Sequence, residues 1–116
     1  MIISFDFDDT LRLWDGTPCY NMIAHAHALI KDGHELVIVT ARRQTFDNHI
    51  FIMDFLNTHE IKVKRVICVN HELKGPTLKE AKVEHHYDDS ESHCISAVEN
   101  GVRAFLVKDD SFQELV

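Results

Sequence analysis

The chain has 116 residues, of which 45% are hydrophobic and 27% charged, an ordinary balance from which we expect a single globular domain over residues 1–116. Its formal net charge of −7 disfavours a broad electrostatic surface for nucleic acid, although a local basic patch remains compatible with it. Three cysteines without zinc-site spacing, no signal-peptide pattern and no apolar run near ~18 residues predict a cytoplasmic protein with reduced thiols and no membrane span.

Apolar strand-like runs alternate with amphipathic helix-like segments along the chain. The predicted strands lie near residues 1–7, 35–39, 64–69, 84–87 and 103–107. The predicted helices lie near residues 20–32, 45–58, 76–82, 91–100 and 111–115. This alternation predicts an α/β, three-layer, Rossmann-like fold with a five-stranded parallel sheet. Between the first strand and helix, Trp14 and Tyr20 either pack on the core or flank a substrate entrance.

The first predicted strand ends in two carboxylates at alternate positions, Asp6 and Asp8. Buried parallel strands exclude charged residues from their middles, but ligands bind at their carboxyl ends. Two carboxylates this close repel each other, and a bound divalent cation removes that repulsion. Mg²⁺ prefers such oxygen ligands together with phosphate oxygens. An isolated Asp-x-Asp is also common in solvated turns, so the pair needs support from the rest of the chain.

Three further segments place polar groups at expected strand or helix ends. The second strand runs into Thr40 and Arg42, whose hydroxyl and guanidinium can hold phosphate oxygens, although Thr40 could instead cap a helix. The fourth strand ends in Asp88 and Asp89. Lys74 stands just before a Gly-Pro pair of the kind that begins helices. The ordered combination favours a phosphate and metal site.

In this order the segments resemble the motifs of the haloacid dehalogenase (HAD) superfamily of phosphohydrolases. Asp6-Phe7-Asp8-Asp9-Thr10 is similar to the first motif, Thr40 to the second, and Asp88-Asp89 to the fourth. The resemblance covers roughly residues 1–107. It implies the HAD-like α/β fold and a Mg²⁺-dependent phosphatase.

The third motif of this family is a lysine, and its position in this chain is ambiguous. Lys74, Lys79 and Lys82 all lie in the allowed interval. Lys74 is favoured because the family lysine often precedes the helix that leads into the fourth-motif strand, and Lys79 is the next choice.

The resemblance implies a role for each matched residue. Asp6 would be the nucleophile that forms a phosphoaspartate, and Asp8 the general acid and then the general base. Thr40 and Lys74 would hold the phosphoryl oxygens. Arg42 would contact the substrate, unless it is an exposed residue at a helix start.

The same resemblance implies a Mg²⁺ site. The Asp6 side chain, the Asp8 backbone carbonyl and the Asp88 carboxylate would hold the ion, and Asp89 would support it directly or through water. Thr10 would shape the turn and form a hydrogen bond near Asp8. On the fourth strand, we expect one of the two adjacent histidines to point inward and to be satisfied within the core.

The segments between the motifs are too short for the cap domain of most family members, so we expect a capless, open site. Open sites suit a nucleotide, a polynucleotide end or a sugar phosphate, and a homo-oligomer could cover the site instead of a cap. Arg42-Arg43, Lys62, Lys64 and Arg65 could supply local positive charge near a phosphate chain. The alternative is a catalytically silent module that binds a phosphorylated partner without turnover.

Overall fold

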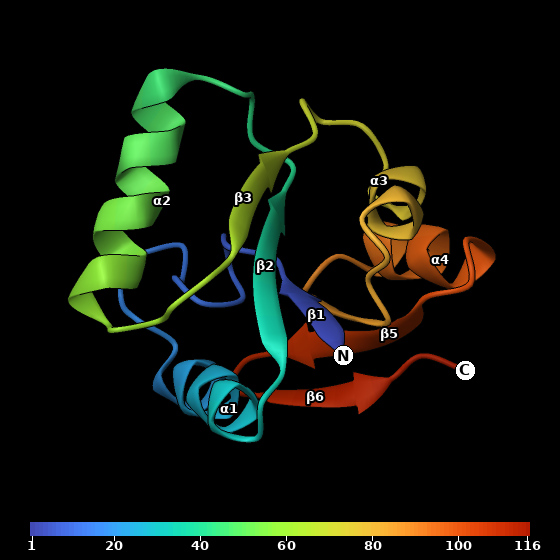
Figure 1. The fold of residues 1–116 in the computed structure, drawn as a ribbon, viewed down its shortest axis with the longest axis horizontal. Helices are drawn as coiled ribbons and strands as arrows, with labels where there is room; N and C mark the ends of the chain where they lie inside the picture. Colours follow the sequence, from blue (N-terminus) through green and yellow to red (C-terminus); the bar gives the residue numbers. More distant parts are fainter.

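A computed structural model describes all residues from 1 to 116 as a six-stranded sheet between helices (Figure 1). The strands are β1 (Ile2–Phe5), β2 (Glu35–Thr40), β3 (Arg65–Cys68), β4 (His85–Asp88), β5 (Arg103–Lys108) and β6 (Ser111–Glu114). The helices are α1 (Tyr20–Lys31), α2 (Phe46–Thr58), α3 (Gly75–Glu80) and α4 (Glu91–Glu99). Their spatial order in the sheet is β3-β2-β1-β4-β5-β6.

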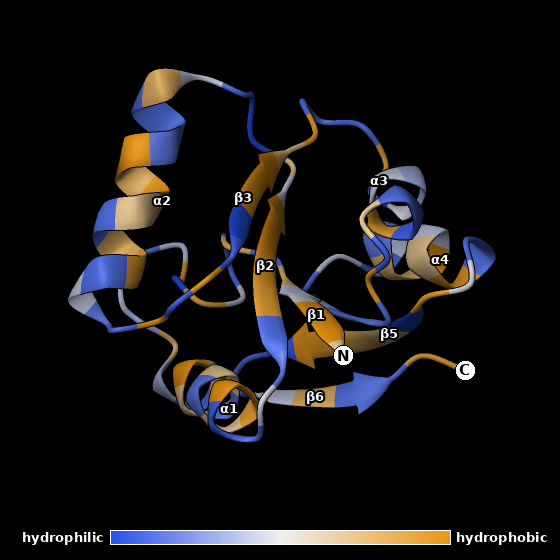
Figure 2. Cartoon of the chain, in the orientation of Figure 1, coloured by the Kyte–Doolittle hydropathy of each residue, from blue (hydrophilic) through white to orange (hydrophobic).

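Strand β1 occupies the middle of the sheet and pairs in parallel with β2 and β4. The residues of β2 after its first are all buried, because the sheet is covered on both faces. Figure 2 shows the corresponding apolar colouring of the central strands. This arrangement brings the carboxyl ends of β1, β2 and β4 to one edge of the sheet.

The two faces of the sheet carry separate apolar clusters. Helices α1 and α2 cover one face, where the larger cluster includes Phe5, Phe7 and Ile52 (Figure 1). Helices α3 and α4 cover the other face, where a smaller cluster includes Leu78 and Ala97. The α/β class and the layered arrangement of the sequence prediction are therefore confirmed.

The predicted helix at residues 111–115 and the five-stranded, all-parallel sheet are wrong. This segment forms β6, which pairs antiparallel with β5 through a two-residue turn and makes the sheet six-stranded and mixed. Asp109 adopts a positive φ of 57° in the turn. The Phe112 ring packs edge-on against Tyr87 at a centroid distance of 5.0 Å. Pairing with β5 and the packing of Phe112 on Tyr87 thus override the weak helical pattern.

The connection between β1 and α1 is an irregular loop with an exposed tip. The Leu13 amide donates to the Thr17 carbonyl at 2.8 Å and closes the loop. Trp14 is 86% exposed and Tyr20 is 67% exposed, so the interpretation of both as core residues is wrong. No helix is both long and apolar enough to span a membrane.

Candidate active site

Polar side chains from three adjacent strands meet at the carboxyl edge of the sheet. Asp6 follows β1, Thr40 ends β2 and Asp88 ends β4. They line one open cavity of about 210 Å³. The cavity is also lined by Asp8, Asp9, Ala41, Lys74, Asp89, Ser90 and His93. The structure therefore places all the predicted site residues at this cavity except Thr10 and Arg42, which do not line it but bond to Asp6 and Asp8.

A buried lysine joins two of the carboxylates. The Lys74 ammonium donates to Asp6 Oδ1 at 2.9 Å and to Asp88 Oδ2 at 2.6 Å, and its side chain is only 1% exposed. Lys79 and Lys82 are exposed on the surface, away from this cluster. Of the three candidate lysines, the geometry selects Lys74.

Tight packing at the start of α3 holds Lys74 in place. The Gly75 amide donates to Ser96 Oγ on α4 at 3.0 Å. A Cβ at Gly75 would collide with the Ser96 carbonyl and the Asn100 amide, so only glycine allows this approach. Lys74 thus enters the site from a backbone that is fixed against α4.

Burial and neighbouring charges set the protonation of the cluster in opposite directions. Burial raises the pKa of Asp6 well above its usual range, and Lys74 opposes this effect only in part. Burial also favours a higher pKa for Asp88, but hydrogen bonds from His86 and Lys74 outweigh it and hold that pKa below its usual range. Burial would lower the pKa of Lys74, yet Asp6 and Asp88 keep it raised. Asp88 and Lys74 therefore form the fixed ion pair.

Three carboxylates of the site are placed to hold a divalent cation. One oxygen from each of Asp6, Asp88 and Asp89 lies within 4.8 Å of the others. These three carboxylates face one buried ammonium, so full ionisation leaves negative charge uncompensated. Hard oxygen donors in this number suit Mg²⁺. Asp8 lines the same cavity.

The proposed acid/base residue, Asp8, is engaged in a bidentate ion pair. Arg42 donates from Nε to Asp8 Oδ2 at 2.8 Å and from Nη2 to Asp8 Oδ1 at 2.9 Å. Arg42 also donates to Asn48 Oδ1 at 3.0 Å, and its guanidinium lies 4.8 Å from the Phe51 ring centroid. Arg42 thus contacts Asp8 directly and lies next to the cavity.

Two threonines at the site have structural contacts. Thr10 is fully buried and its hydroxyl donates to Asp6 Oδ2 at 3.3 Å. The Thr10 hydroxyl therefore bonds to Asp6, because the turn after β1 folds back onto that carboxylate, and Thr10 is not among the residues that line the cavity; a contact of Thr10 with substrate stays a prediction. Thr40 Oγ1 accepts the Arg42 amide at 3.2 Å while lining the cavity.

Sequence reasoning missed the partners that support Asp88. His86 is buried as predicted, and its Nε2 lies 2.7 Å from Asp88 Oδ2 while Nδ1 lies 2.6 Å from Ser4 Oγ. Burial lowers the pKa of His86, so the neutral ring donates to Asp88 and accepts from Ser4. The alternation of His86 and Asp88 along β4 was the available signal. The Cys94 thiol donates to the Asp88 carbonyl at 3.6 Å, and burial raises its pKa to about 12.

No protein-family model and no curated protein matches the chain. Solved structures do share its fold. A chain of the Pnkp1/Rnl/Hen1 RNA repair complex superposes with a TM-score of 0.73 at 16% identity over 91% of this chain. A chain in another structure of the Pnkp1/Rnl/Hen1 complex gives 0.75 at 15% identity over 96%. This chain spans 42% and 47% of those two chains, and at such identities the likeness establishes a common α/β fold.

Proposed function

We propose that this chain is a Mg²⁺-dependent phosphomonoesterase of the HAD type that acts through a phosphoaspartate. The observation that supports it most strongly is the buried Asp6–Lys74–Asp88 cluster at the carboxyl edge of a parallel sheet. Burying two carboxylates and an ammonium is costly for stability alone. Their position at the ligand-binding edge of an α/β fold gives that cost a functional reason.

In the first step, Asp6 attacks the phosphorus atom and the bond from phosphorus to the ester oxygen breaks. Asp8 donates its proton to the departing oxygen, which leaves as an alcohol. The Lys74 ammonium, next to Asp6, offsets negative charge on the phosphoryl oxygens. The Thr40 hydroxyl offers a further hydrogen bond at the cavity wall.

In the second step, Asp8 accepts a proton from water, and the water oxygen attacks phosphorus and releases Asp6 as a carboxylate. Bound Mg²⁺, held by Asp6, Asp88 and the Asp8 carbonyl with Asp89 beside them, would neutralise charge on the phosphoryl oxygens. Thr10 holds the Asp6 carboxylate in orientation throughout, through its 3.3 Å hydrogen bond.

The substrate is a phosphorylated nucleotide, a polynucleotide end or a sugar phosphate. The size of the cavity suits a single phosphoryl group, and the cavity opens to solvent without a covering domain. The common fold with chains of an RNA repair complex favours a nucleic-acid end among these classes. A second subunit could cover the open site, and we place the protein in the cytoplasm.

One observation favours the second candidate, a binding module without turnover. Both Asp8 carboxylate oxygens accept from Arg42, so Asp8 is not free to transfer a proton in this arrangement. For turnover, a substrate phosphate must compete with Asp8 for Arg42. In a silent module the ion pair would persist.

Phosphate release from a panel of phosphorylated compounds distinguishes the two candidates. The panel contains p-nitrophenyl phosphate, sugar phosphates, mononucleotides and phosphorylated oligonucleotides, each with Mg²⁺. The phosphatase predicts turnover that Asp6→Asn abolishes and Asp8→Asn lowers by at least about 100-fold on poor leaving groups. No turnover on any compound, with Mg²⁺ still bound, would support the binding module.

A further inference from the structure

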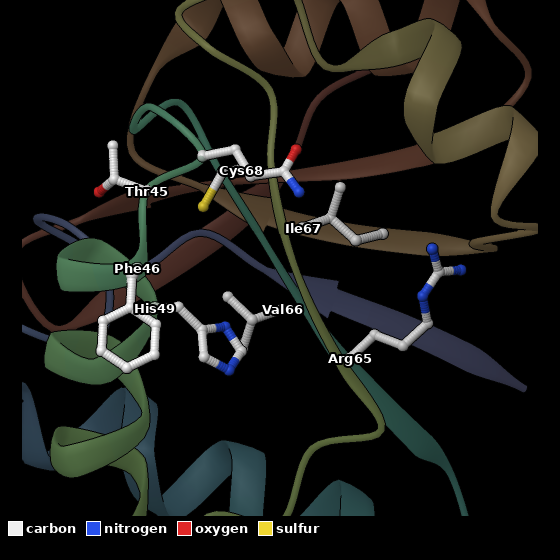
Figure 3. Close-up of a pocket in the computed structure, with 8 residues that line it drawn as sticks. Thr45, Phe46, His49, Arg65, Val66, Ile67 and Cys68 are labelled. Carbon is white, nitrogen blue, oxygen red and sulfur yellow. The ribbon is translucent and has the colours of Figure 1, made fainter.

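A second depression adjoins the catalytic edge between α2 and the edge strand β3, and encloses about 560 Å³. We name it the α2–β3 groove. Its lining includes the rings of Phe46 and His49, the apolar side chains of Val66 and Cys68, and Arg65. Figure 3 shows His49 reaching from the helix side towards Val66 of β3, the Phe46 ring turned outward beside it, and the Arg65 side chain extending from the other side of β3. The groove follows β3 from Cys68 at the catalytic edge towards Arg65 at the start of the strand.

The groove begins next to the phosphate site. Cys68 pairs with Thr40, which lines the catalytic cavity, across strands that lie about 4.8 Å apart. The Gln44 amide, at the groove wall, donates to Asn70 Oδ1 at 2.8 Å, and the Asn70 amide donates to the Arg42 carbonyl at 3.1 Å. These bonds join the wall of the groove to the loop that carries Arg42.

We propose that the α2–β3 groove binds the leaving strand of a single-stranded polynucleotide whose terminal phosphate occupies the catalytic cavity. A base stacks on Phe46, and a backbone phosphate lies beside Arg65. This inference rests on the proposed function for the position of the terminal phosphate. Phe46 is 79% exposed at the start of α2, so it contributes little to the core and presents a free aromatic face. Such faces bind unpaired bases without sequence preference.

Charge selects this groove over the depression on the other side of the catalytic edge. This other depression encloses about 450 Å³ and presents the exposed Trp14 and Tyr20, but Asp109 and Asp110 also line it. Two carboxylates there repel a phosphodiester backbone. The lining of the α2–β3 groove contains Arg65 and no carboxylate. A polyanion leaving the catalytic cavity is therefore drawn along β3.

Oligonucleotide binding in EDTA tests this inference without turnover. The probe is a short dye-labelled single strand with a terminal phosphate, followed by fluorescence anisotropy. Phe46→Ala is expected to weaken binding about tenfold, because one stacked base is lost. Arg65→Gln is expected to weaken binding and to reduce the slope of log K against log salt by about 0.7. Trp14→Ala, which removes a similarly exposed aromatic ring from the other depression, is the matched control and should bind like the wild type.

Release of phosphate from p-nitrophenyl phosphate with Mg²⁺ keeps the two proposals apart. This substrate has no strand to place in the groove, so Phe46→Ala and Arg65→Gln should turn it over like the wild type. If Phe46→Ala weakens oligonucleotide binding but the wild type shows no turnover, the binding role of the groove is supported and the phosphatase proposal is refuted. Three results would each refute strand binding in the groove. They are wild-type binding by both groove variants, weaker binding by Trp14→Ala alone, and no binding by the wild type.

Discussion

Removal of the Lys74 ammonium should destabilise the fold through the two carboxylates that it leaves behind. Lys74 is 1% exposed and bonds to Asp6 at 2.9 Å and to Asp88 at 2.6 Å. Breaking a buried ion pair from one side costs about 3–5 kcal/mol. We therefore expect Lys74→Met to lose about 3–5 kcal/mol of unfolding free energy in EDTA, which is a large part of the ~5–15 kcal/mol of a typical domain.

Urea unfolding with and without Mg²⁺ measures this loss and tests its cause. A cation that occupies the carboxylates stabilises the folded state by about 2.7 kcal/mol at a concentration 100 times its Kd. Without the competing ammonium, Lys74→Met should gain more from Mg²⁺ than the wild type gains. Lys79→Met is the control, because Lys79 is exposed on α3, the helix that follows Lys74, and its loss should cost no more than about 0.5 kcal/mol.

A second variant keeps the test informative if Lys74→Met does not fold. Asp6→Asn together with Lys74→Met removes one stranded carboxylate, so this double variant should be more stable in EDTA than Lys74→Met alone. Wild-type stability for Lys74→Met in EDTA would refute the electrostatic reasoning, and so would a double variant that is less stable still.

Three further predictions concern single residues. Gly75→Ala should cost about 1–3 kcal/mol in urea unfolding, because the added methyl group collides with Ser96; unchanged stability would contradict the packing. Burial lowers the pKa of His25, so its neutral form contributes stability that is complete above the unfolded pKa of about 6.5 and is lost as pH falls below it. His25→Gln should therefore lose less stability than the wild type between pH 7 and pH 5, the opposite result counting against this assignment. Arg42→Gln should raise KM for p-nitrophenyl phosphate about tenfold by removing a phosphate ligand next to Asp8; an unchanged KM would limit Arg42 to holding Asp8.

The sequence was sufficient to predict the parallel core of the fold. Strands β1, β2, β3 and β5 each contain three or more apolar residues, whereas in β4 (His85–Asp88) Tyr87 is the one apolar side chain and the paired acids that follow marked the strand end. β6 was missed because its turn, Asp109-Asp110, lacks the glycine that usually marks a two-residue hairpin. Its four residues also gain their strand conformation from packing that is distant in sequence, above all Phe112 on Tyr87.

The site was predicted as a set of strand ends, but its internal contacts required the fold. Asp6 follows β1, and Thr40 and Asp88 end β2 and β4, so their convergence could be inferred from topology. Lys74 was favoured from its place before a predicted helix, but its bonds to Asp6 and Asp88 depend on the packing of Gly75 against α4, which no local pattern shows. The Asp8–Arg42 ion pair joins residues from two different strand ends, and neither residue alone indicates which partner it takes.

The most direct test of the central claim is to detect the phosphoryl group on Asp6. The protein is mixed with p-nitrophenyl phosphate and Mg²⁺ and quenched in acid, and the masses of the intact protein and of its peptides are measured. Asp8→Asn should accumulate the adduct, because this leaving group needs no acid while the attack of water needs the base. The account predicts one hydroxylamine-sensitive phosphoryl group on the peptide that contains Asp6, and none in Asp6→Asn. Phosphate release without any adduct, or an adduct that persists in Asp6→Asn, would contradict it.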